Sequence, residues 1–139
     1  KKRETVGFTP PENARELHAK IRALEEKIVS HFGLHYRVVD VCTGDLGYPA
    51  TRKWDIEAWF PSQKKYRELT STSNTTDYQT RRLNIAYKNN EGERKLLHTV
   101  NGTGITDRLW LALLEQYQQA DGSVKLPQVL HEELPWETL

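Results

Sequence analysis

The apolar positions of this chain first follow a helical spacing. Between residues 11 and 32 they recur every three or four positions, at Ala14, Leu17, Ile21, Leu24, Ile28 and Phe32. This is the period of an amphipathic helix with one buried stripe. The segment Thr9-Pro10-Pro11-Glu12 matches a capping box at the start of this helix, and Gly33 matches a left-handed stop at its end.

From residue 36 onward apolar and polar positions alternate, which predicts strands at about 36–42, 54–60, 66–72, 81–88 and 95–101. In the second strand, one face should carry Trp54, Ile56, Ala58 and Phe60, and the other Asp55, Glu57 and Trp59. Gly, Pro, Asn and Ser clusters separate these segments, and the run 89–92 should form a hairpin turn. The middle of the chain is therefore predicted to be an antiparallel meander.

A second helical period runs from Arg108 to Gln118 through Leu109, Leu113, Leu114 and Tyr117. Because Trp110 and Leu111 make this segment apolar on most sides, we expect it to be buried. Helices combined with an antiparallel meander indicate an α+β fold. A length of 139 residues without an evident linker indicates one domain.

Composition and charge narrow the function classes. The formal net charge of +1 provides no global basic field for nucleic acid, so such a role must rest on local contacts. Cys42 is the single cysteine, and we expect it to be a small buried residue. One cysteine and histidines without ligand spacing give no reason to expect zinc. No apolar run reaches the ~20 residues that span a bilayer, and no membrane association is expected.

The chain contains no methionine, which indicates a processed, truncated or partial sequence. No signal peptide opens it. We therefore expect a cytoplasmic protein or, as the alternative, one of the mitochondrial matrix or another organelle.

The polar strand YRELTSTSN, residues 66–74, is the first candidate site. If the chain bulges after Glu68, its carboxylate and the Ser71 hydroxyl converge. Two such hard oxygen ligands suit Mg²⁺ together with phosphate oxygens and water. The alternative is a water-facing edge strand, in which hydroxyl side chains are ordinary.

The glycine-bearing loop between residues 100 and 108 is the second candidate, since a strand enters it and a helix follows. Gly102 and Gly104 permit close approach to a ligand, and Thr106 or Asp107 could cap the helix. A cation in the first helical turn, Arg108, requires a nearby anion. That anion is either a side chain such as Asp107 or Glu115, or a bound phosphate.

The pair Arg81-Arg82 lies after Asp77, at the start of the strand expected at 81–88. One interpretation is that this pair forms a salt bridge at the start of that strand. A nucleotide contact is the other.

Several segments together resemble one known family. They are Tyr36 to Gly47, Asp55 to Pro61, Tyr66 to Asn74, Asp77 to Arg82, His98 to Thr103, and Glu115 to Ser123. In order and spacing they are similar to the C-terminal half of a bacterial or organellar seryl-tRNA synthetase. The resemblance implies that residues 1–139 are a partial class II aminoacyl-tRNA synthetase catalytic domain, an antiparallel sheet flanked by helices. It would run from the end of motif 2 through motif 3 to a C-terminal tail.

The same resemblance implies an activity and its site. Family members activate L-serine with ATP to seryl-adenylate and transfer serine to tRNA(Ser). The residues implied to contact serine are Glu4, Asn101 and Thr103. The residues implied to bind ATP are Glu68, Leu69, Thr70, Ser71 and Arg108. Glu68 and Ser71 would hold Mg²⁺, and Arg108, the implied catalytic residue, would contact the γ-phosphate.

The resemblance also implies parts that precede the printed sequence. These are the motif 2 arginine loop, the first strands of the sheet, the motif 1 helix of the family's homodimer, and the coiled-coil arm that recognises tRNA. We therefore expect the isolated chain to be inactive. The loop from Asn101 to Arg108 is slightly shorter than the family pattern. The alternative function is a non-enzymatic synthetase-like paralogue or binding module that retains the fold.

Overall fold

The centre of the molecule is a five-stranded antiparallel sheet, as a computed structural model of all 139 residues shows. Its strand order is β1-β7-β4-β3-β2, and its strands are Lys2–Thr9 (β1), Tyr36–Asp40 (β2), Arg52–Phe60 (β3), Lys65–Thr76 (β4) and His98–Thr106 (β7). A small separate sheet pairs Ala86–Lys88 (β5) with Arg94–Leu96 (β6). The α-helices are Ala14–His31 (α1), Tyr78–Leu83 (α2) and Asp107–Tyr117 (α3).

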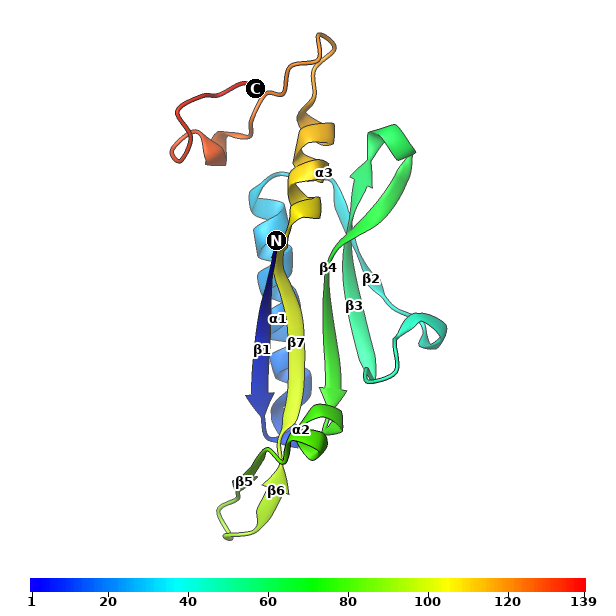
Figure 1. Cartoon of the computed structure of the whole chain (residues 1–139), viewed down its shortest axis with the longest axis vertical. Coiled ribbons are helices and arrows are strands. Elements are labelled where there is room, and N and C mark those ends of the chain that lie inside the picture. Colours follow the sequence, from blue (N-terminus) through cyan, green and yellow to red (C-terminus); the bar gives the residue numbers. More distant parts are fainter.

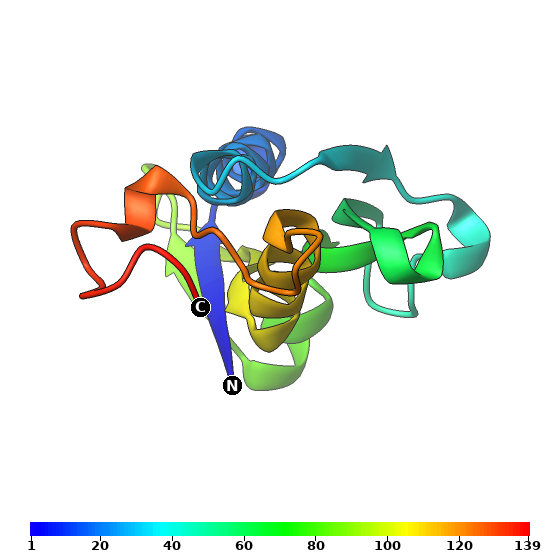
Figure 2. The same ribbon diagram turned by 90° about the horizontal axis from the view of Figure 1, so that it is seen from above.

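Helix α1 lies along one face of the sheet, behind β1 and β7 in Figure 1 and to one side of the strands in Figure 2. We call the opposite face of the sheet the open face. The hairpin β5-β6 and α2 lie at one end of the sheet, and α3 with the C-terminal segment at the other (Figure 1). No helix has the length and apolar character needed to cross a membrane.

The predicted meander is confirmed for β2, β3 and β4, which are neighbours in chain order. The strand predicted at 81–88 is wrong in its first half, because residues 78–83 form α2. Arg81 pairs with Asp77 one turn earlier at 3.2 Å, and Asn84 ends the helix with a left-handed φ of 57°. Only Ala86–Lys88 is extended, and it turns back through Gly92 in the expected hairpin.

The helix predicted at 11–32 is confirmed as a short 3-10 turn, Pro11–Asn13, followed by α1. Its buried stripe differs from the prediction, because Leu24 is 50% exposed while His18 and Glu25 are buried. The reason is the polar surface against which α1 packs: His18 Nε2 donates to the carbonyl of Thr72 at 3.0 Å. The His18 ring also stacks on Trp54, with 4.3 Å between ring centroids.

The predicted helix caps are only partly correct. Gly33 has the expected left-handed φ of 65° after α1. The capping box is wrong, because Thr9 belongs to β1 and no side chain caps the start of α1. No side chain caps α3 either, since the Thr106 hydroxyl donates instead to the carbonyl of Leu69 at 3.1 Å.

The hydrophobic core lies where α1 and α3 meet the sheet. It contains Val29, Leu34, Ile56, Ala58, Phe60, Leu69, Leu109, Ala112, Leu113, Val124, Leu126 and Leu130. Helix α3 is less buried than its composition predicted, because Trp110, Leu111 and Leu114 are exposed. Cys42 is also exposed, so the prediction of a small buried residue is wrong. It precedes the 3-10 turn Thr43–Asp45, in a connection outside the core.

Candidate active site

A β-bulge in β4 decides which side chains reach the open face. Ser71 pairs with Asp55 and Thr70 with Ile56, but the next residue of β3, Glu57, pairs with Glu68. Leu69 is the extra residue, so it and Thr70 are both buried while Glu68 and Ser71 share the open face. Strict alternation would have placed Glu68 with Thr70 instead. The bulge on which the first candidate site depends is therefore present.

Leu69 and Thr70 point away from the open face. Leu69 belongs to the hydrophobic core, and Thr70 donates its hydroxyl to Glu25 Oε2 at 3.1 Å on the α1 side. Any contact of these two residues with a ligand on the open face must therefore come from their main chain.

Strands β1 and β7 bring a carboxylate and a hydroxyl together on the same face. Glu4 and Thr103 are directly paired in register, and the Thr103 hydroxyl donates to Glu4 Oε1 at 3.3 Å. Lys2 forms an ion pair with the same carboxylate. Asn101 lies two residues from Thr103 along β7, so the pleat places both on one face. The three residues implied to contact serine are thus neighbours.

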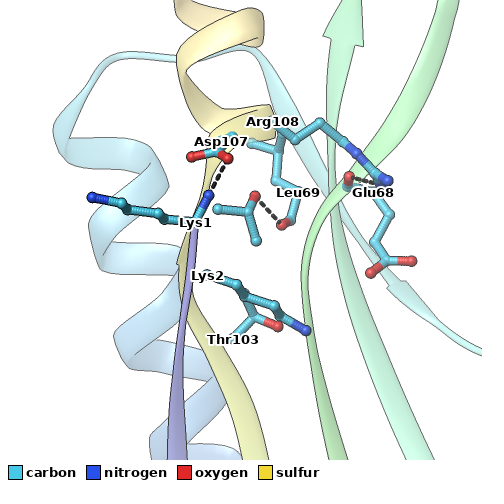
Figure 3. A pocket seen from close by; sticks show the side chains of 8 residues that line it. Lys1, Lys2, Glu68, Leu69, Thr103, Asp107 and Arg108 are labelled. Carbon is cyan, nitrogen blue, oxygen red and sulfur yellow. Dashed lines mark hydrogen bonds and ion pairs between the residues drawn. The ribbon is translucent and has the colours of Figure 1, made fainter.

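Arg108, at the start of α3, reaches across to β4 (Figure 3). Its Nη1 donates to the main-chain carbonyl of Glu68 at 2.6 Å, and it forms no ion pair with any carboxylate. Of the anions considered from the sequence, Asp107 forms no ion pair with Arg108, and Glu115 accepts from the Ser62 N–H at 3.1 Å. The positive charge of Arg108 is therefore available to a ligand.

Glu68, Thr103 and Arg108 line one open hollow of about 510 Å³, whereas Glu4, Asn101 and Ser71 are not among its lining residues. Figure 3 shows the eight residues that line the hollow, which are Lys1, Lys2, Glu68, Leu69, Thr103, Thr106, Asp107 and Arg108. The hollow thus gathers candidate residues from β4, β7 and the first turn of α3, and β1 contributes Lys2 to its lining. The hollow is rich in charge and has few apolar side chains, which suits a charged ligand such as a nucleotide.

Asp55 lies beside the candidate metal ligands and was not singled out from the sequence. It is only 8% exposed, faces Ser71 across the β3–β4 ladder, and its Oδ1 has no hydrogen-bond partner. Burial raises the pKa of Asp55 to about 6, the negative charge of Glu68 adds to this, and Lys53 at 3.4 Å opposes it. Its place opposite Ser71 is the signal that could have found it, once the register was known.

A second buried carboxylate, Glu25 of α1, lies behind the site strands. It is 2% exposed, and only its Oε2 is hydrogen-bonded, to Thr70. Burial raises the pKa of Glu25 to about 8, against a smaller opposing effect of the Thr70 hydrogen bond. Glu25 is therefore mostly protonated at neutral pH, as a buried carboxyl without a cationic partner should be.

This raised pKa predicts that stability falls as pH rises through the neutral range. Above 4.5 an unfolded chain releases the Glu25 proton, while the folded chain keeps it up to about 8. The free energy of unfolding should then fall by about 1.4 kcal/mol per pH unit. Asp55 also makes stability fall as pH rises, but only up to a pH of about 6. Burial of His18 makes stability rise with pH, but only below pH 6.5. The window from 6.5 to 8 therefore reports on Glu25.

Urea unfolding across this window provides the measurement. Glu25→Gln should remove most of the slope, because the amide does not titrate. Glu26→Gln is the matched control, since Glu26 is the partly exposed neighbour paired with Arg22 at 2.8 Å. Parallel pH profiles for wild type and Glu25→Gln would contradict the assignment.

Comparison with known proteins defines the class of this fold and site. The chain belongs to the class II tRNA synthetase core family, since residues 1–117 match the family model described as tRNA synthetase class II core domain (G, H, P, S and T). Among individual proteins it is similar to serine–tRNA ligases. That of Treponema denticola is 53% identical over 132 residues, and that of Rubrobacter xylanophilus is 53% identical over 128 residues.

Solved structures agree with these relatives. Seryl-tRNA synthetase from Pyrococcus horikoshii, complexed with ATP, matches 99% of this chain with a TM-score of 0.94 and 43% identity. The cytoplasmic serine–tRNA ligase of Naegleria fowleri, in complex with AMP, matches 94% with a TM-score of 0.83 and 37% identity. The predicted family and antiparallel α+β fold are therefore confirmed.

The chain covers only part of each relative. The match with the Treponema denticola protein includes 93% of this chain but only 31% of that protein. The match with the Pyrococcus horikoshii structure includes 31% of that chain.

Proposed function

We propose that this chain forms the part of a serine–tRNA ligase catalytic domain that binds Mg²⁺-ATP and serine, from the end of motif 2 to the C-terminal tail. The whole enzyme would activate L-serine to seryl-adenylate, transfer serine to tRNA(Ser) and act as a homodimer. The observation that carries the proposal is the unpaired Arg108 anchored on the Glu68 carbonyl. This contact joins the two candidate nucleotide elements, and the relatives support it by their names and their ATP and AMP complexes.

The donor set on the open face suits a magnesium ion. Glu68 offers a carboxylate, Ser71 offers a hydroxyl, and beside them the buried Asp55 Oδ1 lacks a partner. Hard oxygen ligands that leave room for water and phosphate oxygens are what Mg²⁺ prefers. Bound there, Mg²⁺ would neutralise charge on the triphosphate.

The remaining residues have roles that follow from their chemistry. Arg108 would hold the γ-phosphate and stabilise the pyrophosphate that leaves. Glu4 and Thr103 would accept and donate hydrogen bonds around the serine hydroxyl, and Asn101 would add a polar contact beside them. A substrate without the hydroxyl, such as alanine, would leave these groups unpaired, which is a strong basis for rejecting it.

The reaction needs no covalent enzyme intermediate. Serine's carboxylate attacks the α-phosphorus of ATP, the bond to the bridging oxygen of the β-phosphate breaks, and pyrophosphate leaves with that electron pair. The residues of this chain hold the two substrates in line and stabilise the leaving group.

Titration calorimetry with ATP in the presence of Mg²⁺ tests the nucleotide site. Glu68→Ala should weaken ATP binding about tenfold, because a charged metal ligand is lost. Glu57→Ala is the matched control, since it removes the carboxylate directly opposite in register, which is paired with Arg37 at 2.6 Å. Its affinity should match that of wild type.

Omitting Mg²⁺ should remove the difference between wild type and Glu68→Ala. Equal ATP affinities of the two proteins with Mg²⁺ present would remove Glu68 from the mechanism and support the non-enzymatic binding module. The shared hydrogen bond of Glu4 with Thr103 favours the enzyme, because a pure binding module has no need of it.

A further inference from the structure

A second hollow of about 580 Å³ lies at the end of the sheet where β4 runs into α2. Its lining consists of two tyrosines and two arginines, Tyr48, Tyr78, Arg81 and Arg82, which we call the Tyr-Arg platform. Tyr48 comes from the loop between β2 and β3, and the other three come from α2. Figure 1 shows α2 at the end of β4, opposite the end at which α3 begins. The platform is therefore distinct from the hollow around Arg108.

One aromatic ring of the platform, that of Tyr48, is exposed on this chain, and that of Tyr78 is partly buried. Tyr48 is 88% exposed, and its ring meets that of Tyr78 edge to face, with 5.6 Å between centroids. Gly47, with a left-handed φ of 76°, and Pro49 flank Tyr48, and the Ala50 N–H closes this turn on the Gly47 carbonyl at 3.3 Å. This turn thus holds a large ring outside the core that this chain forms.

The two arginines differ in what they contact. Arg81 is paired with Asp77, so the salt-bridged alternative considered from the sequence is correct for this residue. The Arg82 guanidinium lies 3.6 Å from the centroid of the Tyr78 ring and donates to the Tyr78 carbonyl at 2.8 Å. It pairs with no carboxylate, so its charge is not neutralised within the chain. Stacking leaves its outer face and remaining N–H groups free.

We propose that the Tyr-Arg platform binds single-stranded RNA, with a base stacked on Tyr48 and a phosphate held by Arg82. Base stacking on exposed aromatic rings combined with a cation for the backbone is the usual chemistry of such binding. The net charge of +1 requires that binding come from local contacts of this kind. The inference deepens the proposed function, on which it rests, by giving the RNA substrate a contact on this chain.

The position of the platform fits that purpose. Ser71, at the metal site, lies five residues before the end of β4 at Thr76, and α2 begins two residues later. At the rise of an extended strand, the end of β4 that leads into the platform is roughly 17 Å from Ser71. A strand of RNA on the platform would therefore have its free end within reach of the open face.

Fluorescence anisotropy with a short labelled single-stranded RNA tests the platform directly. Tyr48→Ala should weaken binding about tenfold, and Tyr48→Phe should bind like wild type, because stacking needs the ring and not the hydroxyl. Arg82→Ala should weaken binding and lower the salt dependence by about one released ion. Arg15→Ala, which removes an exposed charge from α1 on the other face of the sheet, should have no effect.

The results separate this inference from the proposed function. No RNA binding by wild type, equal binding by Tyr48→Ala, or equal loss in Tyr48→Phe and Tyr48→Ala would overturn the platform. ATP affinity should be unchanged in Tyr48→Ala. RNA binding that depends on Tyr48 in a chain that fails to bind ATP would uphold the platform and refute the nucleotide site.

Discussion

Gly102→Ala is expected to lower the free energy of unfolding by about 3 kcal/mol, since overpacking a tight contact costs this much. A Cβ at residue 102 would lie 2.4 Å from Glu25 Oε1, 2.4 Å from Ile21 Cγ2 and 3.2 Å from Thr72 Oγ1. The side chains of Ile21 and Glu25 cannot move aside easily, because both are buried in the face of α1 that packs on the sheet. The added methyl group would therefore push α1 away from β7.

Urea unfolding measures this loss, and the neighbouring glycine provides a matched control. A Cβ at Gly104 would meet only the Arg3 carbonyl oxygen, at 3.4 Å, which is an ordinary contact. Gly104→Ala should therefore change stability by about 0.5 kcal/mol. If the two alanine variants unfold at the same urea concentration, the close packing of α1 on Gly102 is incorrect.

The second large effect concerns Arg108. Arg108→Ala should weaken Mg²⁺-ATP binding on the order of 100-fold, because a charged hydrogen bond to phosphate and its anchor on the Glu68 carbonyl are both lost. If Arg108 contacts the γ-phosphate, the loss should be seen with ATP and not with AMP. Calorimetric titrations with both nucleotides measure this difference.

Thermal unfolding of the same variant provides the control. Arg108 is exposed, so its removal should leave the melting temperature almost unchanged. An equal loss of affinity for ATP and AMP would place Arg108 elsewhere on the nucleotide. Unchanged affinity for both would refute its role and leave it as a tie between α3 and β4.

Helices and strands whose apolar residues recur at a regular spacing could be predicted from the sequence. The period of α1, the alternation in β3 and the hairpin near Gly92 are all local signals. The face that α1 buries could not be predicted, because it depends on the polar strands beneath it. His18 and Glu25 replace Leu24 in that contact, since β4 offers a carbonyl and a hydroxyl there.

In the candidate site, too, features set by local spacing could be predicted and features set by strand pairing could not. The convergence of Glu68 and Ser71 could be stated as a condition from spacing alone, and the bulge at Leu69 meets it. The position of Asp55 opposite Ser71 could not be predicted, because it depends on the register between two strands. Strand β1 was also missed, since its residues are almost all exposed and show no alternation of burial.

The pairing of β1 with β7 has a consequence for how the chain folds. Glu4 and Thr103 are separated by 99 positions, and even the partners of these two strands that are nearest in sequence, Thr9 and His98, are joined by most of the chain. Contacts of such high sequence separation carry the largest loop-closure entropy and lower the folding rate. The two groups proposed to select serine therefore meet only when nearly the whole chain has assembled, whereas Glu68 and Ser71 belong to one local hairpin. The pair proposed to select serine is in this sense a late product of folding, and the pair proposed to hold the metal an early one.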